Sequence, residues 1–177
     1  MPREPRRPPP PLDQQALERL ALRYVERFAT TRAKLVDYLR RKLRERGQAG
    51  AVDPAALADR MVELRYIDDA AFAEGKAAAM ARRGLGPRRV RDALRHAGVA
   101  QADSAALDED IDGTAWAVAM AFARRRRIGP FGPAAVERPA REKQVAAMVR
   151  AGHAPALARR ILSLDPVDIE APPDDYT

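Results

Sequence analysis

The stretch Leu94-Arg95-His96-Ala97-Gly98 has two near copies elsewhere in the chain. They are Leu43-Arg44-Glu45-Arg46-Gly47 and Met148-Val149-Arg150-Ala151-Gly152, and the three glycines are 51 and 54 residues apart. Such a period is typical of helical repeat proteins, in which each unit contacts mainly its neighbours. The sequence therefore predicts an all-α protein, an elongated, curved array of three tandem three-helix modules.

Helical periodicity around these strings supports the same fold. In the first predicted helix, apolar residues recur three and four positions apart, which indicates one buried face made of Leu17, Leu20, Ala21, Tyr24, Val25 and Phe28. Five aromatic residues have core spacing, so we interpret them as module cores and not as base-stacking platforms: Tyr24, Phe28, Phe72, Trp116 and Phe122. Phe131, in a proline-glycine break, is the aromatic residue that could be exposed.

Cap and turn residues predict where individual helices begin and end. Thr31 is suited to cap a helix that ends at Gly47, and Asp53 with Pro54 opens the next one. Asp68 or Asp69 caps the following helix, and a weaker helix covers 104–111. The predicted modules are 15–66, 67–112 and 113–164.

The two ends of the chain have a different composition. Six of the first eleven residues are proline, which predicts a disordered, proline- and arginine-rich arm over 1–14. Residues 165–177 carry five carboxylates and several prolines, which predicts a disordered acidic tail.

Charge and composition narrow the classes of function. The net charge is +7; residues 1–16 contribute +1 and residues 165–177 contribute −5, which leaves +11 for the stretch between them. This excess favours a polyanion or an acidic protein surface as partner. The chain has no cysteine, no nucleophile–base arrangement, no metal-ligand spacing and no long apolar run. We therefore expect a cytoplasmic, monomeric, non-enzymatic protein without catalytic residues, metal, cofactor or membrane contact.

The most specific motif lies in the middle module. Tyr66-Ile67-Asp68-Asp69-Ala70-Ala71-Phe72-Ala73 is followed by a glycine-rich break, a basic helix and a terminal glycine-aliphatic pair over 84–99. This pattern resembles the RecX family, whose members have three tandem three-helix repeats. The resemblance covers roughly residues 20–164, and its motif positions are Tyr66, Asp68, Asp69, Phe72, Gly86, Leu94, Gly98 and Gly152. One departure is His153, where the family usually has a phenylalanine.

The resemblance implies a regulatory protein of DNA repair and recombination. It implies binding in the groove of the RecA–DNA filament, with or without direct contact to the DNA phosphates, and weaker strand exchange, ATP hydrolysis and co-protease activity. Two other classes fit the residues as well. One is a direct, sequence-nonspecific nucleic-acid-binding helical protein, and the other is a helical-repeat adaptor for an unrelated acidic partner.

Candidate partner-binding residues are the densest cationic groups. A stripe of four lies on one predicted helix, a run of four ends another, and three more follow it: Arg88, Arg89, Arg91 and Arg95; Arg124, Arg125, Arg126 and Arg127; and Arg138, Arg141 and Lys143. The stripe could also be an ordinary solvated helix face. Part of the run could serve only to interact with a helix dipole.

Overall fold

The helix boundaries follow the predicted capping residues. The computed structural model describes residues 10–133 and 137–165. The Thr31 side chain accepts a hydrogen bond from the Lys34 amide at 3.2 Å, and Asp53 accepts from the Ala55 amide at 2.8 Å. The helix that starts at Asp69 is capped by Asp68, whose carboxylate accepts from the Ala71 amide at 2.9 Å. These bonds satisfy amide groups that a helix start leaves without partners, and they confirm the predicted caps.

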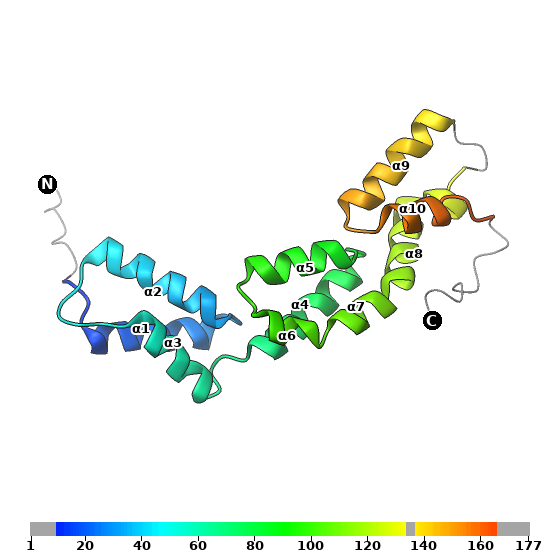
Figure 1. Cartoon of the computed structure of the whole chain (residues 1–177). Coiled ribbons are helices and arrows are strands. Elements are labelled where there is room, and N and C mark those ends of the chain that lie inside the picture. Colours follow the sequence, from blue (N-terminus) through cyan, green and yellow to red (C-terminus); the bar gives the residue numbers. More distant parts are fainter. Residues whose placement is uncertain (1–9, 134–136, 166–177) are drawn as a thin grey trace, which may run out of the picture. The chain divides into compact units, whose positions relative to one another are not determined.

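The described residues fall into two compact units. The first runs to Phe72 and includes Ala97–Val99, and the second comprises Ala73–His96 and the described residues from Ala100 onward. The helices of the first unit are α1 (Gln14–Arg27), α2 (Arg32–Arg46) and α3 (Pro54–Glu63) (Figure 1). The second contains α4 (Asp69–Arg82), whose first turn belongs to the first unit, then α5 (Pro87–His96), α6 (Gln101–Ala105), α7 (Asp108–Gly113), α8 (Ala115–Arg126), the 3-10 turn η1 (Gly129–Phe131), α9 (Arg138–Arg150) and α10 (Pro155–Ile161).

The secondary structure confirms the all-α prediction. Across residues 10–133 and 137–165, helices are joined by turns and one isolated bridge between Leu12 and Gln48. The helix order is consistent with three-helix modules. In the second module, two short helices, α6 and α7, follow α4 and α5 in place of a single third helix. We predicted a single helix over 104–111; instead α6 ends before α7 begins at Asp108.

The first unit is held together by the apolar faces of α1, α2 and α3. Its hydrophobic core cluster consists of Leu17, Ala21, Leu35, Val36, Leu39, Leu57, Ala58, Met61 and Ile67, together with Leu12. Leu12 lies within the arm that we predicted to be disordered over 1–14, and this part of the prediction is wrong. Its amide donates to the Gly47 carbonyl at 2.9 Å, and its side chain is fully buried. Residues 1–9 and 166–177 of the predicted arm and tail lie outside the described residues.

Phe28 is a second correction in this unit. We predicted that it shares the buried face of α1, but its side chain is 50% exposed. The helix ends at Arg27, and Phe28 has an extended backbone with φ −133° and ψ 125°. Because the chain has left the helix, the i+4 relationship to Tyr24 no longer places Phe28 in the core.

The second unit has its main core between α8, α9 and α10. The core residues include Trp116 and Phe122, as predicted, with Ala119, Ala123, Met148, Leu157, Ala158 and Ile161. Leu85 packs against this core from the break between α4 and α5. Phe131 is half-buried against the same cluster, so it is not the freely exposed aromatic residue that its loop position allowed.

The repeated glycines lie where a helix end meets the start of an earlier helix. In the first unit, a β-carbon on Gly98 would stand 2.3 Å from the Ala33 methyl group, and the Thr31 hydroxyl donates to the Ala97 carbonyl at 2.5 Å. In the second unit, a β-carbon on Gly152 would stand 2.6 Å from the Arg89 amide nitrogen. Both glycines have positive φ, +70° and +99°. Two of the three repeat strings therefore keep glycine where elements approach closely.

Candidate polyanion-binding site

Arg91 is already neutralised inside the second unit. From α5 its guanidinium donates to Asp108 at 2.7 Å and to Asp112 at 2.8 Å, both on α7. The hydrogen bonds to Asp112 and Asp108 raise the pKa of Arg91 above its ordinary value, against the opposing effect of desolvation. Arg91 therefore joins two helices, and its charge is matched by two carboxylates.

Two neighbours of Arg91 on α5 also have partners within the chain. Arg95 forms an ion pair with Asp92, one turn before it. The Arg88 guanidinium donates to the Val149 carbonyl near the end of α9 at 3.0 Å. In the described part of the chain, Arg89 is the member of the predicted stripe whose side chain has no hydrogen bond or ion pair. The stripe thus offers less free charge than its sequence suggests.

The arginine run at the end of α8 has mixed roles. Arg125 donates to the Arg82 carbonyl, at the end of α4, at 3.2 Å. It therefore satisfies a carbonyl that the helix end leaves without a partner. Arg124 lies 5.0 Å from the Phe131 ring centroid, and Arg126 lies 5.7 Å from that of Phe122. Arg127, the residue after α8, has φ +52° and makes no side-chain hydrogen bond within the described residues.

Of the three candidate cations on α9, two have a partner within the chain and one has none among the described residues. Arg138 pairs with Glu142 at 3.3 Å. Arg141 donates to the Leu162 carbonyl at 3.2 Å and to the Ser163 hydroxyl at 2.8 Å, which ties α9 to the end of α10. Lys143 forms no such bond in the described residues.

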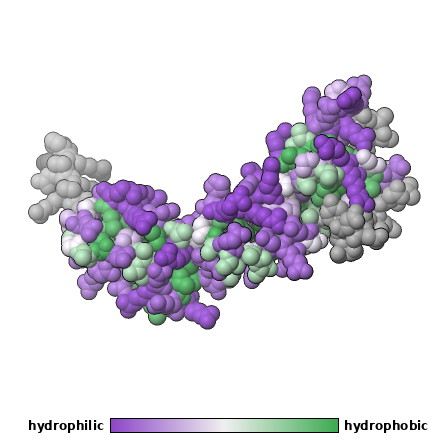
Figure 2. Space-filling model, in the orientation of Figure 1, coloured by the Kyte–Doolittle hydropathy of each residue, from purple (hydrophilic) through white to green (hydrophobic). Residues whose placement is uncertain are grey.

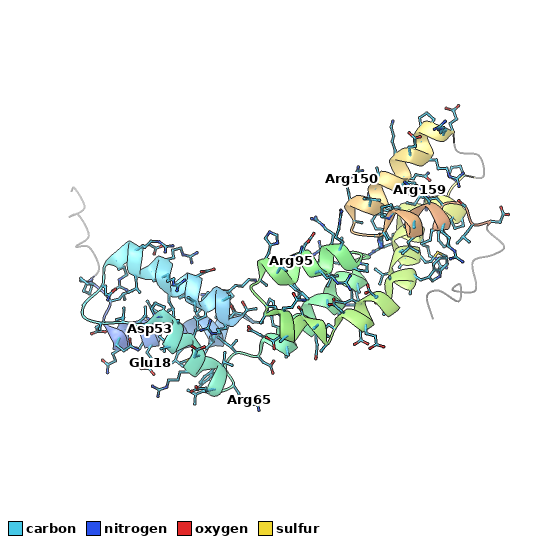
Figure 3. All side chains as sticks on the ribbon, viewed as in Figure 1. Glu18, Asp53, Arg65, Arg95, Arg150 and Arg159 are labelled. Carbon is cyan, nitrogen blue, oxygen red and sulfur yellow. The ribbon has the colours of Figure 1, made fainter. Side chains whose placement is uncertain are left out.

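Three cations without an ion pair in the described residues line one groove between α8 and α9. This groove, of about 530 Å³, carries Arg126, Lys143 and Arg150, with Gln144, on a floor of Leu85, Phe122, Ile128, Ala147 and Ala151. Figure 3 shows Arg150 on α9, and Figure 2 shows hydrophilic residues gathered over α9. We refer to Arg126, Lys143 and Arg150 with this floor as the α8–α9 groove.

Arg150 was missed as a candidate in the sequence. It follows Lys143 by seven residues, and this spacing places both side chains on one face of a helix. Arg150 also lies inside a repeat string, which indicates a structural role for its residues and gives no sign of a binding role. Gln144, the polar neutral residue of the groove, was missed too.

His153 occupies a buried position beside the groove floor. Its ring centroid lies 5.4 Å from that of Phe122, and its side chain contacts the Gly84 carbonyl through Nε2 at 3.1 Å. Because a carbonyl only accepts, Nε2 carries the proton, and Nδ1 is left without a partner within the described residues. Burial lowers the pKa of His153, and the bond to Gly84 opposes this only in part.

The motif residues mostly have structural roles. Asp68 caps α4, while the Asp69 carboxylate accepts from the Arg32 amide at the start of α2 at 2.9 Å. Leu94 is buried, and Phe72 is half-buried with the Lys34 ammonium 5.1 Å from its ring centroid. Tyr66, in contrast, is 52% exposed.

Metal-binding clusters and membrane-spanning helices are both absent from the residues that the structure describes. No group of three or more histidine, cysteine or acidic side chains there could hold a metal ion. None of the helices there has the length and apolar character needed to cross a membrane.

Comparisons with known proteins agree on one family. The family model described as RecX, second three-helix domain, matches residues 68–106. The regulatory protein RecX of Myxococcus xanthus (strain DK1622) is 30% identical over 168 residues, which span 85% of this chain and 86% of that protein. The crystal structure of RecX from Lactobacillus salivarius is similar in fold, with a TM-score of 0.58 at 17% identity, over 84% of this chain and 93% of that one.

Proposed function

Because the chain belongs to the RecX family, we propose that it binds the RecA–DNA filament and weakens its strand exchange, ATPase and co-protease activities. The Myxococcus xanthus relative carries the name of a regulatory protein, which supports regulation over catalysis. The observation that carries the proposal for this chain is the α8–α9 groove, where Arg126, Lys143 and Arg150 lack ion-pair partners in the described residues.

The groove is suited to a partner whose surface carries both anionic groups and apolar groups. Its cations attract carboxylates or phosphates of the filament, and its floor of Leu85, Phe122 and Ile128 offers apolar contact. A nucleoprotein filament presents both kinds of anion. Arg89 and Arg127 supply further charge on the same unit, whereas Arg91, Arg95, Arg125 and Arg141 are engaged in contacts within the chain.

Co-sedimentation with RecA–DNA filaments tests the contribution of the groove. We compare the wild type with the triple variant Arg126→Gln, Lys143→Gln, Arg150→Gln. A matched control removes three exposed charges from the first unit, with Arg19→Gln, Arg40→Gln and Arg44→Gln. We expect the groove variant to bind several-fold more weakly and with a shallower salt dependence, because fewer counterions are released. The control is expected to lose much less affinity.

The same experiment separates the proposal from simple nucleic-acid binding. A direct polyanion binder would sediment with naked DNA as strongly as with the filament, and the two triple variants would then weaken equally. A filament regulator prefers the filament. Equal losses in the two variants would contradict the role proposed for the groove.

A further inference from the structure

An aromatic cluster lies on the surface of the first unit, on α1 and α2. The Tyr24 and Tyr38 rings are stacked, with centroids 4.2 Å apart and an interplanar angle of 20°. The Phe28 ring lies 5.3 Å from Tyr24 and is tilted by 51°. Both tyrosines pack in part against the core, whereas Phe28 is half exposed. These three residues, the aromatic cluster, therefore present ring surface to the outside.

Cations surround this cluster. The Arg27 guanidinium lies 5.5 Å from the Phe28 centroid, and Arg41 and Lys42 lie 5.6 and 5.9 Å from the Tyr38 centroid. Glu45 pairs with Lys42 at 2.6 Å and with Arg41 at 3.7 Å, so one carboxylate serves two cations. Arg27 has no ion pair among the residues described. Positive charge therefore exceeds negative charge around the rings.

The core of the first unit does not require this exposed ring. Its buried positions are filled by aliphatic residues such as Leu17, Leu35 and Leu39. Among the described residues, four large apolar side chains are more than a third exposed, and three of them, Val62, Leu64 and Tyr66, lie at or just beyond the end of α3. Phe28 is the one that adjoins both stacked rings and cations.

We propose that the aromatic cluster binds single-stranded nucleic acid, with an unpaired base stacked on Phe28 and the flanking phosphates held by Arg27, Arg41 and Lys42. A base has a flat apolar face and is linked to an anion on either side, which matches an exposed ring with neighbouring cations. An acidic peptide would use only the cations. Duplex DNA would offer phosphates, but its bases are already stacked. This activity needs no RecA, so it goes beyond the proposed function.

Binding of a short oligothymidylate in the absence of RecA tests this site. Fluorescence anisotropy is measured with a labelled strand of about 20 nucleotides and with an abasic strand of equal length and charge. We expect the wild type to prefer the strand with bases, and Phe28→Ala to lose about tenfold in affinity for it, the range of one stacked base. Phe28→Ala should leave affinity for the abasic strand unchanged.

Two further variants keep the result independent of folding and charge. Phe28→Trp should retain binding, and its indole fluorescence should be quenched by the oligonucleotide, beyond any change from the single native tryptophan, Trp116. Leu64→Ala, at an exposed apolar position that is not part of the cluster, should bind like the wild type. Equal affinity of the wild type for both strands would overturn the proposal, and so would an unchanged affinity in Phe28→Ala. Competition by polyglutamate as strong as by oligothymidylate would instead assign the cluster to an acidic protein.

Discussion

Gly152 lies so close to Arg89 that a β-carbon at Gly152 would stand 2.6 Å from the Arg89 amide nitrogen. The neighbouring backbone is joined across the same place, because the Gly86 amide donates to the Ala151 carbonyl at 2.9 Å. The turn after α9 is thus fastened directly to the start of α5. Stability of the second unit should depend on this contact.

The substitution Gly152→Ala tests the contact. The methyl group would meet the backbone nitrogen and two side-chain carbons of Arg89, and φ of +99° is strained for any residue with a side chain. We therefore expect a loss of about 2 kcal/mol or more in unfolding free energy. Urea denaturation followed by Trp116 fluorescence reports on this unit, since Trp116 is buried in its core. Gly113→Ala is the control, because a β-carbon there would have no atom within 4 Å. Equal stability of the two variants would contradict the argument.

His153 should make the second unit less stable in mild acid. Its folded-state pKa lies below the ordinary value of about 6.5, so the unfolded chain binds the proton more readily. Stability is full above about pH 6.5 and falls as the pH drops towards the folded-state pKa. We expect the midpoint of urea denaturation to be lower at pH 5.5 than at pH 7.5. His153→Phe should make this pH dependence weaker. His96→Gln, at an exposed position, should keep the wild-type slope; a wild-type slope in His153→Phe would refute the assignment.

Arg91 should couple α5 to α7. We expect Arg91→Gln to lower the unfolding free energy by about 1 kcal/mol. This value is modest because Asp108 and Asp112, the partners of Arg91, are partly exposed to solvent. The double variant Arg91→Gln, Asp108→Asn should lose less unfolding free energy than the two single variants lose in sum. A double-mutant cycle of urea denaturations measures this difference. Strict additivity would mean that the ion pair adds no coupling.

Neighbouring arginines of the run should separate stability from binding. Arg125→Gln removes a bond to the Arg82 carbonyl and should lower the unfolding free energy by about 1 kcal/mol. Arg126→Gln should stay within about 0.5 kcal/mol of the wild type, because its side chain makes no hydrogen bond in the described residues. For affinity in filament co-sedimentation we expect the opposite order: Arg126→Gln should bind the filament more weakly than Arg125→Gln. The same order in both assays would contradict the division.

Most of the fold could be predicted from local patterns. Thr31, Gly47, Asp53 and Asp68 act within a few residues of their own position, so their roles follow from the adjacent sequence. Leu12 and Phe28 could not be placed in this way. Leu12 is buried because the chain pairs with residues after α2, and Phe28 is exposed because α1 ends one residue earlier.

The candidate site was harder to predict because charge says nothing about partners. The two carboxylates that pair with Arg91 lie 17 and 21 residues away in the sequence. The carbonyl that accepts from Arg125 lies 43 residues away. These contacts depend on tertiary packing and leave no local signal. Lys143 and Arg150 did leave one, since a spacing of seven places them on one helix face.

The most direct test of the central claim is DNA-dependent ATP hydrolysis by the cognate RecA with this protein added at substoichiometric ratios. We predict inhibition by the wild type and by the control Arg19→Gln, Arg40→Gln, Arg44→Gln, and much weaker inhibition by Arg126→Gln, Lys143→Gln, Arg150→Gln. Inhibition that begins only when enough protein is present to coat the DNA, with no difference between the two variants, would contradict a filament regulator that acts through the α8–α9 groove.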